Sequence, residues 1–400
     1  MGSNCVASTS IGCLFCCKGC NAEKVRNAFT FIPPPPSYTV EEEENGQMTY
    51  LMEGLEASDL YRKAREASEM HWLTTRMGHR VPMVWLRRSK LREPREANRE
   101  EALGQPLVLL HCHGNATDIG MMMGPYYELG KVLGIEVCGV EYAGYGAASG
   151  RPSSGNTYAD VEAAYDYLVA KGIPPNRIVA YGQSVGSGPA TALASKKPCG
   201  GVVLHSPLLS GIKVVDPKPD VCCRPSCVWS CFDFYPNDRR VRQLLCPLLV
   251  MHGQRDDIIP FYHGFRLHKQ CPKQFRWPAY FPQRAGHNDL VETDMRAYFG
   301  EVASFLQDVR KIAEGNKVDP PTQSFEKPSQ VQMVLKPTES EPRQVEMAEM
   351  SDFLTSGPEN QPVVKVGPED GRYEEFRKGN IRVQLEPNEA NGTGQARELG

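Results

Sequence analysis

The sequence predicts an α/β fold in which helices cover both faces of a mostly parallel sheet. Between residues 27 and 309, apolar runs of strand length alternate with helical patterns at the spacing of strand–helix–strand crossovers. This alternation is typical of a parallel sheet that is buried on both faces. The expected strands are 81–88, which we expect to be antiparallel, and then 106–114, 135–144, 177–182, 200–208, 246–253 and 276–282.

Two helices have a predicted starting point. Residues 156–172 carry a helical pattern, and Thr157 with Asp160 predicts a capping box at its first turn. The last helix is expected to begin after Asp289, which would form a second capping box with Glu292.

Composition divides the chain of 400 residues into three parts. Residues 1–25 are rich in Cys, residues 26–312 carry the strand and helix patterns, and residues 313–400 are acidic and rich in Pro. The last part has too little apolar surface to offset its ordering entropy, so we expect it to be disordered. The formal net charge of −3 gives no electrostatic reason to expect a nucleic-acid partner. No apolar run approaches the roughly 18–20 residues of a membrane-spanning helix.

The stretch 178–188 reads IVAYGQSVGSG and places Ser184 between two glycines. Its apolar start resembles the end of a buried strand, and the small residues after Gly186 suit a packed helix. Glycines on either side of the serine allow strand and helix to approach closely, and such a turn lifts the hydroxyl above the sheet edge. We therefore predict that Ser184 is a nucleophile, although a G-x-S-x-G match alone also occurs by chance.

A serine nucleophile needs an imidazole to take its proton and a carboxylate to orient that imidazole. Two aspartates follow the strand at 246–253, and neighbouring side chains of an extended segment point to opposite sides. We choose Asp256 as the acid, with Asp257 as the alternative, and His287 in the next loop as the base. The chain order Ser–Asp–His is typical of α/β-hydrolases, so the predicted fold becomes the α/β-hydrolase fold.

Acyl transfer also requires donors for the oxyanion of the tetrahedral intermediate. One predicted donor is the backbone N–H of Val185, directly after the nucleophile. The other is expected from the loop after the strand at 106–114, from Asn115 or alternatively Ala116. In this loop His113 is expected to shape the turn rather than to take part in the chemistry.

The remaining candidates for chemistry are interpreted as structural. His111, His205 and His252 lie near strand ends, where we expect them to be satisfied core residues. The chain has neither the phosphate-binding G-x-x-x-x-G-K-[ST] pattern nor the zinc-binding H-E-x-x-H pattern. The Cys-rich run at 222–231 lacks paired C-x₂-C spacing and a nearby His, which favours a structural or acylated loop. We therefore expect no cofactor and no metal.

Five of the 14 cysteines lie in the first twenty residues. Four of them, Cys13, Cys16, Cys17 and Cys20, alternate with apolar residues in a pattern that is typical of S-acylation sites. Stable anchoring takes two or more acyl chains, since each buried CH₂ contributes only about 0.8 kcal/mol. A zinc-binding knuckle and a tail of unmodified thiols remain the alternatives. Gly2 is a further acceptor to consider for myristate, although Val6 departs from that motif.

Several long motifs together resemble one family. These are the Cys-rich start, FIPPPPSYTV (31–40), HCHGNATD (111–118), EYAGYGAASGRPS (141–153), NTYADVEAAYDYL (156–168), AYGQSVGSGPA (180–190), LHSPLLSG (204–211), CFDFYPN (231–237) and GHNDL (286–290). They resemble the α/β-hydrolase-domain-containing protein 17 family, which consists of membrane-associated serine hydrolases that remove palmitate from proteins. The resemblance extends to about residue 310, and the chain departs from the pattern at an insertion, 216–230, and in its long tail.

The resemblance implies Ser184 as the nucleophile, Asp256 as the acid and His287 as the base. It also implies palmitoylation of the N-terminal cysteines, and hence a peripheral enzyme on the cytoplasmic face of the plasma membrane or endosomes. Its partners would be S-palmitoylated membrane proteins as substrates. A lipid or acyl-CoA esterase, a serine peptidase of the same fold and a membrane-tethered scaffold without catalysis are the alternatives.

Overall fold

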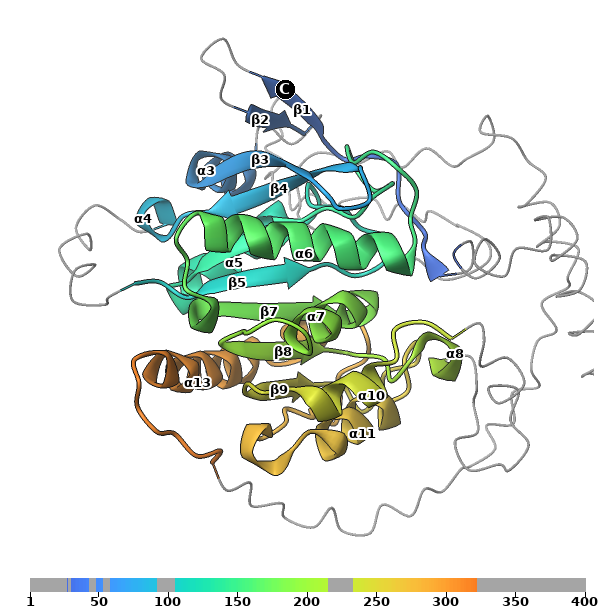
Figure 1. The fold of residues 1–400 in the computed structure, drawn as a ribbon, viewed down its shortest axis with the longest axis vertical. Helices are drawn as coiled ribbons and strands as arrows, with labels where there is room; N and C mark the ends of the chain where they lie inside the picture. Colours follow the sequence, from blue (N-terminus) through green and yellow to red (C-terminus); the bar gives the residue numbers. More distant parts are fainter. Residues whose placement is uncertain are drawn as a thin grey trace, which may run out of the picture. The chain divides into compact units, whose positions relative to one another are not determined.

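Seven strands form the central sheet in the computed structural model of the chain (Figure 1). The structure describes residues 27, 30–42, 48–52, 58–91, 105–214 and 233–321, all within the compact unit Met1–Gln332. The strands are β3 (Ser68–Thr74), β4 (Arg80–Leu86), β5 (Val108–Cys112), β6 (Glu136–Val140), β7 (Ile178–Gln183), β8 (Gly201–His205) and β9 (Leu248–Met251). Their order in the sheet is β3-β4-β6-β5-β7-β8-β9.

Five adjacent strands are parallel, as the alternating sequence pattern predicts: β6, β5, β7, β8 and β9. In β5, β6, β8 and β9 every residue is buried, which explains why these strands are apolar runs without alternation. Strands β3 and β4 are antiparallel, which confirms the expectation for 81–88. The carboxyl ends of the parallel strands share one edge of the sheet, which is where ligand sites form in such folds.

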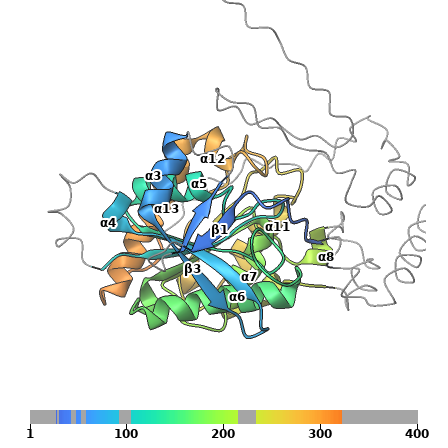
Figure 2. The same cartoon turned by 90° about the horizontal axis from the view of Figure 1, so that it is seen from above.

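Helices cover the two faces of the sheet and bury two apolar cores (Figure 2). On one face lie α6 (Ser154–Ala170) and α7 (Ser187–Ala194), and on the other lie α3 (Asp59–Ala67), α5 (Met123–Leu133) and α13 (Met295–Ala313). The remaining described helices are α4 (Arg88–Leu91), α8 (Gly211–Val214), α10 (Asn237–Arg240), α11 (Tyr262–Gln270), α12 (Leu290–Thr293) and the 3₁₀ turns η3 (Pro175–Arg177), η4 (Ser184–Gly186), η6 (Val241–Gln243) and η7 (Lys273–Phe275).

Two strand regions differ from the prediction. A separate hairpin of β1 (Thr39–Glu42) and β2 (Met48–Leu51), together with β3, was not expected from the sequence. Residues 276–282 form only isolated bridges, at Arg276 and Tyr280, instead of a strand. Pro278 lies between these bridges and has no N–H to donate to a ladder, so pairing is interrupted there.

Both predicted capping boxes are wrong. Ser153, whose side chain accepts from the Asn156 amide, caps α6, and the helix therefore begins at Ser154, two residues earlier than expected. Asp289 is the N-cap residue of α12, which begins at Leu290 as expected, but its carboxylate accepts from the Gly286 amide and makes no capping bond. The last long helix, α13, is capped by Asp294. In each case the nearby aspartate is used for another contact.

Several predictions fall outside the described residues. These are the acylation of Cys13, Cys16, Cys17 and Cys20, the role of 216–230, and the disorder of most of 313–400, of which only residues up to 321 are described. Among the described helices, none combines the length and apolar character needed to cross a bilayer.

Candidate active site

The nucleophile candidate sits on a turn that leaves no room for side chains at the flanking glycines. Ser184 follows β7 directly and has a positive φ of 52°. A Cβ on Gly182 would lie 2.6 Å from the Gly186 carbonyl oxygen, and one on Gly186 would lie 2.1 Å from the Cys112 carbonyl oxygen. Only glycine therefore fits at either position, and the strand passes into α7 with the Ser184 side chain half-buried at the sheet edge.

The structure brings Ser184, His287 and Asp256 together in one hydrogen-bonded chain. The Nε2 atom of His287 lies 3.0 Å from Ser184 Oγ, and its Nδ1 atom lies 2.7 Å from Asp256 Oδ2. Both His287 and Asp256 are only 8% exposed, so little water competes for these bonds. The alternative acid, Asp257, is exposed, and it is Asp256 that contacts the imidazole.

Asp256 is held as a carboxylate by four donors. Its Oδ1 accepts from the amides of Ile258 and Ile259, at 3.0 and 2.7 Å. Its Oδ2 accepts from His287 and lies 3.1 Å from His252 Nε2. Burial raises the pKa of the Asp256 carboxyl, but hydrogen bonds from the two histidines outweigh burial and hold the pKa well below its usual value. The acid is therefore ionised and oriented toward the imidazole.

His252 is a site residue that sequence reasoning missed. Its Nε2 faces both Asp256 Oδ2 and the carbonyl oxygen of Ile259, at 3.1 and 2.8 Å. Because both of these atoms accept, the proton is assigned to Nε2, and His252 donates toward the acid. The spacing His-Gly-Gln-Arg-Asp after an apolar strand was the available signal, but it did not distinguish a core histidine from one that orients Asp256.

The other two strand-end histidines lie in the core and contact tyrosine hydroxyls. His111 stacks on Tyr181 with ring centroids 4.7 Å apart, and burial keeps its pKa well below the usual value. The Nδ1 atom of His205 lies 2.7 Å from the Tyr181 hydroxyl oxygen, and burial lowers the pKa of His205 to about 3. Both are therefore neutral at physiological pH.

The loop after β5 lies beside the nucleophile. A Cβ built on Gly114 would be 3.9 Å from Ser184 Cβ, which places Asn115 and Ala116 at the start of the same turn. Ala116 has a positive φ of 53°, a strained conformation for a residue with a side chain. Val185, the other predicted oxyanion donor, is buried directly after Ser184.

The side chain of Asn115 is occupied by structural bonds. Its Oδ1 accepts from the Ile32 amide at 2.9 Å and from the Tyr145 hydroxyl at 2.7 Å. Its Nδ2 donates to the Thr30 carbonyl at 2.7 Å. Any oxyanion contact from Asn115 must therefore come from its backbone N–H, which makes no hydrogen bond to another described residue.

His113 and Glu141 form a buried pair beneath this loop. Both side chains are fully buried, and His113 Nε2 lies 2.9 Å from Glu141 Oε1. The Nδ1 atom of His113 lies 2.8 Å from the Gly114 carbonyl oxygen, so neither ring nitrogen faces Ser184. Glu141 also accepts from the Tyr38 hydroxyl and the Ile119 amide at 3.0 Å each. The expectation that His113 shapes the turn agrees with these contacts.

Other features of the described residues lie away from this chemistry. Cys112, Cys138 and Cys246 are buried free thiols, and burial raises the pKa of each. No group of three or more His, Cys, Asp and Glu side chains in the described ranges could hold a metal ion.

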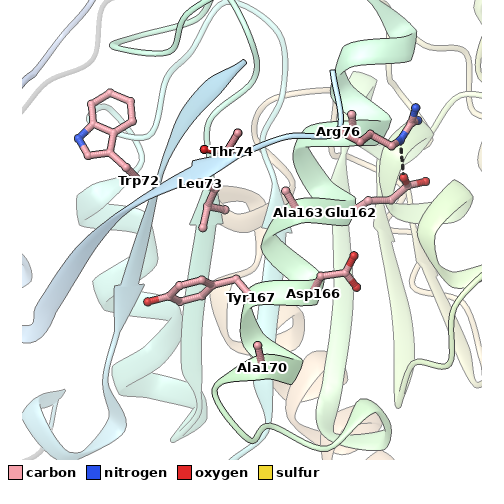
Figure 3. Close-up of a pocket in the computed structure, with 10 residues that line it drawn as sticks. Trp72, Leu73, Thr74, Arg76, Glu162, Ala163, Asp166, Tyr167 and Ala170 are labelled. Atoms are coloured by element: carbon pink, nitrogen blue, oxygen red, sulfur yellow. Dashed lines mark hydrogen bonds and ion pairs between the residues drawn. The ribbon is translucent and has the colours of Figure 1, made fainter. Parts of the chain in front are cut away.

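A pocket of about 390 Å³ lies between β3 and α6 (Figure 3). An ion pair from Arg76 to Glu162, 2.9 Å long, crosses one side of it. Its lining consists of Trp72, Leu73, Thr74, Arg76, Ala159, Glu162, Ala163, Asp166, Tyr167 and Ala170. This lining contains no Ser, Cys or His, and so lacks a nucleophile–base pair. The candidate active site is therefore the edge that carries Ser184.

No family model matches the chain, but individual relatives do. Human alpha/beta hydrolase domain-containing protein 17B is 33% identical over 290 residues, which cover 72% of this chain and 92% of the relative. Alpha/beta hydrolase domain-containing protein aho-3 of Caenorhabditis elegans is 36% identical over 308 residues, which cover 76% of this chain and 84% of the relative.

Solved structures with a similar backbone are more distant. The esterase Pf2001 of Pyrococcus furiosus is 16% identical, with a TM-score of 0.48, and the match covers 69% of this chain and 99% of the esterase. An alpha-beta hydrolase from Vibrio vulnificus is 19% identical, with a TM-score of 0.47, over 60% of this chain and 81% of that protein. By its similarity to the curated relatives over most of their length, the chain belongs to the alpha/beta hydrolase domain-containing protein 17 family and has the α/β-hydrolase fold.

Proposed function

We propose that the protein is a serine hydrolase that uses Ser184 as nucleophile, His287 as base and Asp256 as the orienting acid. The observation that carries this proposal is the unbroken chain Ser184 Oγ–His287 Nε2 and His287 Nδ1–Asp256 Oδ2, with distances of 3.0 and 2.7 Å. A nucleophile, a base and an acid joined in this order are what acyl transfer requires.

In the proposed reaction, Ser184 Oγ attacks the carbonyl carbon of an acyl substrate while His287 Nε2 takes the hydroxyl proton. The backbone amides of Asn115 and Val185 would donate to the oxyanion, and losing one such donor typically costs about 10²–10³ in rate. The imidazolium then gives its proton to the leaving group as the carbon–heteroatom bond breaks. A water molecule, activated by His287, attacks the acyl-enzyme and releases the fatty acid and free Ser184.

The substrate that we propose is a palmitoyl thioester on membrane proteins. Its thiolate leaves more readily than an amide nitrogen, and the S-acylation pattern at Cys13, Cys16, Cys17 and Cys20 would hold the enzyme on the same surface as its substrates. This would place the enzyme on the cytoplasmic face of the plasma membrane or of endosomes. Family membership supports hydrolase chemistry, and the resemblance noted in the sequence supports depalmitoylation.

Labelling with a fluorophosphonate probe tests the nucleophile. We expect the wild type and Ser195→Ala to be labelled and Ser184→Ala to remain unlabelled. Ser195 is a suitable control because it caps the far end of α7, where its hydroxyl donates to the Ala192 carbonyl. An unlabelled wild type, or labelling of Ser184→Ala, would support the non-catalytic scaffold instead.

Palmitate turnover in cells then tests the substrate. Cells that express the wild type should lose labelled palmitate from membrane proteins faster than cells that express Ser184→Ala. If turnover is the same while the purified enzyme cleaves a lipid ester or acyl-CoA, the esterase alternative holds. Cleavage of peptides alone would favour the peptidase.

Replacing the four N-terminal cysteines by serine tests the anchor. We expect the variant with Cys13, Cys16, Cys17 and Cys20 changed to Ser to move from the membrane fraction to the cytosol. Its purified activity on a soluble thioester should equal that of the wild type, because the changes lie outside the proposed site. Retention of this variant in the membrane fraction would show that another feature anchors the protein.

A further inference from the structure

The segment 30–38, which we call the strap, crosses the loop beside the nucleophile. Its first end is fixed by the Asn115 side chain, which bonds the Thr30 carbonyl and the Ile32 amide at 2.7 and 2.9 Å. A side-chain amide that bonds two backbone groups of one segment holds that segment in a defined orientation. The contact joins positions 83 residues apart in the sequence.

The other end of the strap is held by two buried carboxylates. The Ser37 amide donates to Asp118 Oδ2 at 2.7 Å, and the Tyr38 hydroxyl donates to Glu141 Oε2 at 3.0 Å. Asp118 ends the loop that begins at His113, and Glu141 is the partner of His113. Both ends of the strap are therefore hydrogen-bonded to residues that form or support this loop.

Side-chain packing also holds the strap against this loop. Phe31 is 6% exposed, belongs to the same apolar core as Val185, and meets the Tyr235 ring edge to face. A Cβ on Gly120 would lie 2.4 Å from the Ser37 hydroxyl oxygen. The loop therefore leaves just enough space for the strap to lie against it.

The geometry of the peptide after Gly114 connects the strap to the proposed chemistry. A trans peptide is planar, so its carbonyl oxygen and its N–H point in opposite directions. Because the Gly114 carbonyl is bonded by His113 Nδ1 at 2.8 Å, the Asn115 N–H points away from His113. The bonds from the strap to the Asn115 side chain then hold the same residue from its other side.

We propose that the strap is a positioning element for the oxyanion donor: by holding the Asn115 side chain, it sets the orientation of the Asn115 backbone N–H. This proposal rests on the proposed function, because it assigns the strap to the same reaction. Thr30 and Ile32 act through Asn115 and do not touch the substrate. A segment ahead of the catalytic domain's sheet thereby contributes to transition-state stabilisation.

Ile32→Pro and Ile32→Ala form a matched pair that tests the proposal in the full-length protein. Proline has no N–H, so Ile32→Pro removes the bond to Asn115 Oδ1, whereas Ile32→Ala keeps it. The Ile32 side chain is 57% exposed, so its loss alone should matter little. On a soluble short-chain thioester we expect kcat to fall by roughly 10–100-fold in Ile32→Pro with KM within about twofold, since a displaced donor loses part of the 10²–10³ effect of a missing one. Ile32→Ala should keep the wild-type kcat.

Asn115→Ala gives a second route to the same loss, and it decides the question if Ile32→Pro does not fold. We expect a fall in kcat at least as large as in Ile32→Pro, because Asn115→Ala removes all three side-chain bonds, including the one to Ile32. The double variant should therefore lose no more than Asn115→Ala alone. A wild-type kcat in Asn115→Ala or in folded Ile32→Pro, equal losses in Ile32→Pro and Ile32→Ala, or additive losses would overturn the proposal.

The rate of fluorophosphonate labelling separates this proposal from the proposed function. Phosphonylation of Ser184 also uses the oxyanion donors, so its rate should follow the same order among the variants. If the wild type is labelled but cleaves no thioester, the substrate assignment fails while the labelling rates still test the strap. If labelling of Ile32→Pro is as fast as that of Ile32→Ala, the strap proposal fails alone.

Discussion

Two buried histidine–carboxylate pairs lie near Ser184, and they differ in what the second ring nitrogen of the histidine faces. His287 contacts Asp256 through Nδ1 at 2.7 Å and leaves Nε2 for the serine hydroxyl at 3.0 Å. His113 contacts Glu141 through Nε2 at 2.9 Å, but its Nδ1 is bonded to a backbone carbonyl at 2.8 Å. A histidine and a carboxylate therefore give an imidazole that faces a hydroxyl in one place and a structural brace in the other.

The difference shows what a histidine needs to be a catalytic candidate. A carboxylate partner orients the ring in both pairs, so the partner does not distinguish them. The distinguishing feature is the second nitrogen, which must face a reactive group and not a carbonyl. The pair of His113 and Glu141 fails this test and instead holds the loop after β5 in place.

The largest expected effect comes from removing the base. His287→Ala should lower kcat for thioester hydrolysis by up to about 10⁶-fold, because the nucleophile and base act as a unit. The change also removes one contact of the buried Asp256 carboxylate, so thermal unfolding of the same preparation should confirm that the variant is folded at the assay temperature. A loss below about tenfold would mean that His287 is not the base and that the comparison with His113 fails.

Removing the charge of the acid should have the next largest effect. Asp256→Asn should lower kcat by on the order of 10⁴-fold, because the amide stabilises the wrong tautomer of His287 and no longer stabilises the imidazolium. Stopped-flow measurement of acyl-enzyme formation would report this loss directly. The matched control is Asp257→Asn, which changes the exposed neighbour and should retain wild-type rates.

Breaking the brace should affect stability more than chemistry. His113→Leu leaves Glu141 buried without one of its contacts, which should lower the free energy of unfolding by about 3 kcal/mol. We expect kcat to fall by only roughly 10–100-fold, since the loop loses its orientation while the nucleophile and base remain. Urea unfolding and steady-state kinetics on the same preparation check both numbers. A loss of kcat as large as that of His287→Ala would mean that His113 takes part in the chemistry.

The sequence predicted the parts of the site that follow from strand order. Ser184 was predicted from its glycine-flanked turn, and Asp256 and His287 from their places after expected strands, whose carboxyl ends meet at one edge. The expected strand before His287 forms only isolated bridges, but these pair with β9 and still bring the loop to this edge. The alternation of side chains along an extended segment predicted that only one of Asp256 and Asp257 would face the site, and it is Asp256 that contacts the imidazole.

What could not be predicted depends on contacts between distant segments. The role of His252 requires the position of its ring relative to Asp256, which no periodicity encodes. The contacts of the strap join Thr30 and Ile32 to Asn115 across more than 80 positions, and the run of prolines there carries no helix or strand pattern. Polar residues with several available partners also misled the capping predictions, because tertiary contacts decided which partner each carboxylate took.

Asp160 is another buried carboxylate, and its contacts differ from those of Asp256. It was expected to cap α6, but it lies within that helix with its side chain fully buried. Its Oδ2 accepts from the Ala143 amide at 2.9 Å, and its Oδ1 has no partner in the described residues. Burial raises the pKa of the Asp160 carboxyl to about 7. Unlike Asp256 with its four donors, it therefore holds a proton below neutral pH.

The variant Asp160→Asn tests whether this raised pKa makes the stability of the wild type fall as pH rises. The folded pKa of about 7 lies above the usual value of 3.8, so between these values the folded state binds more protons than the unfolded state. The wild type should therefore lose stability as pH rises through this range, and the asparagine variant should not. Relative to the variant, the loss between about pH 5.5 and 8 should be about 2 kcal/mol by urea unfolding, while kcat is unchanged. A stability difference that is constant with pH would mean that Asp160 is ionised in the folded protein, and that a single amide donor suffices to hold a buried carboxylate charged.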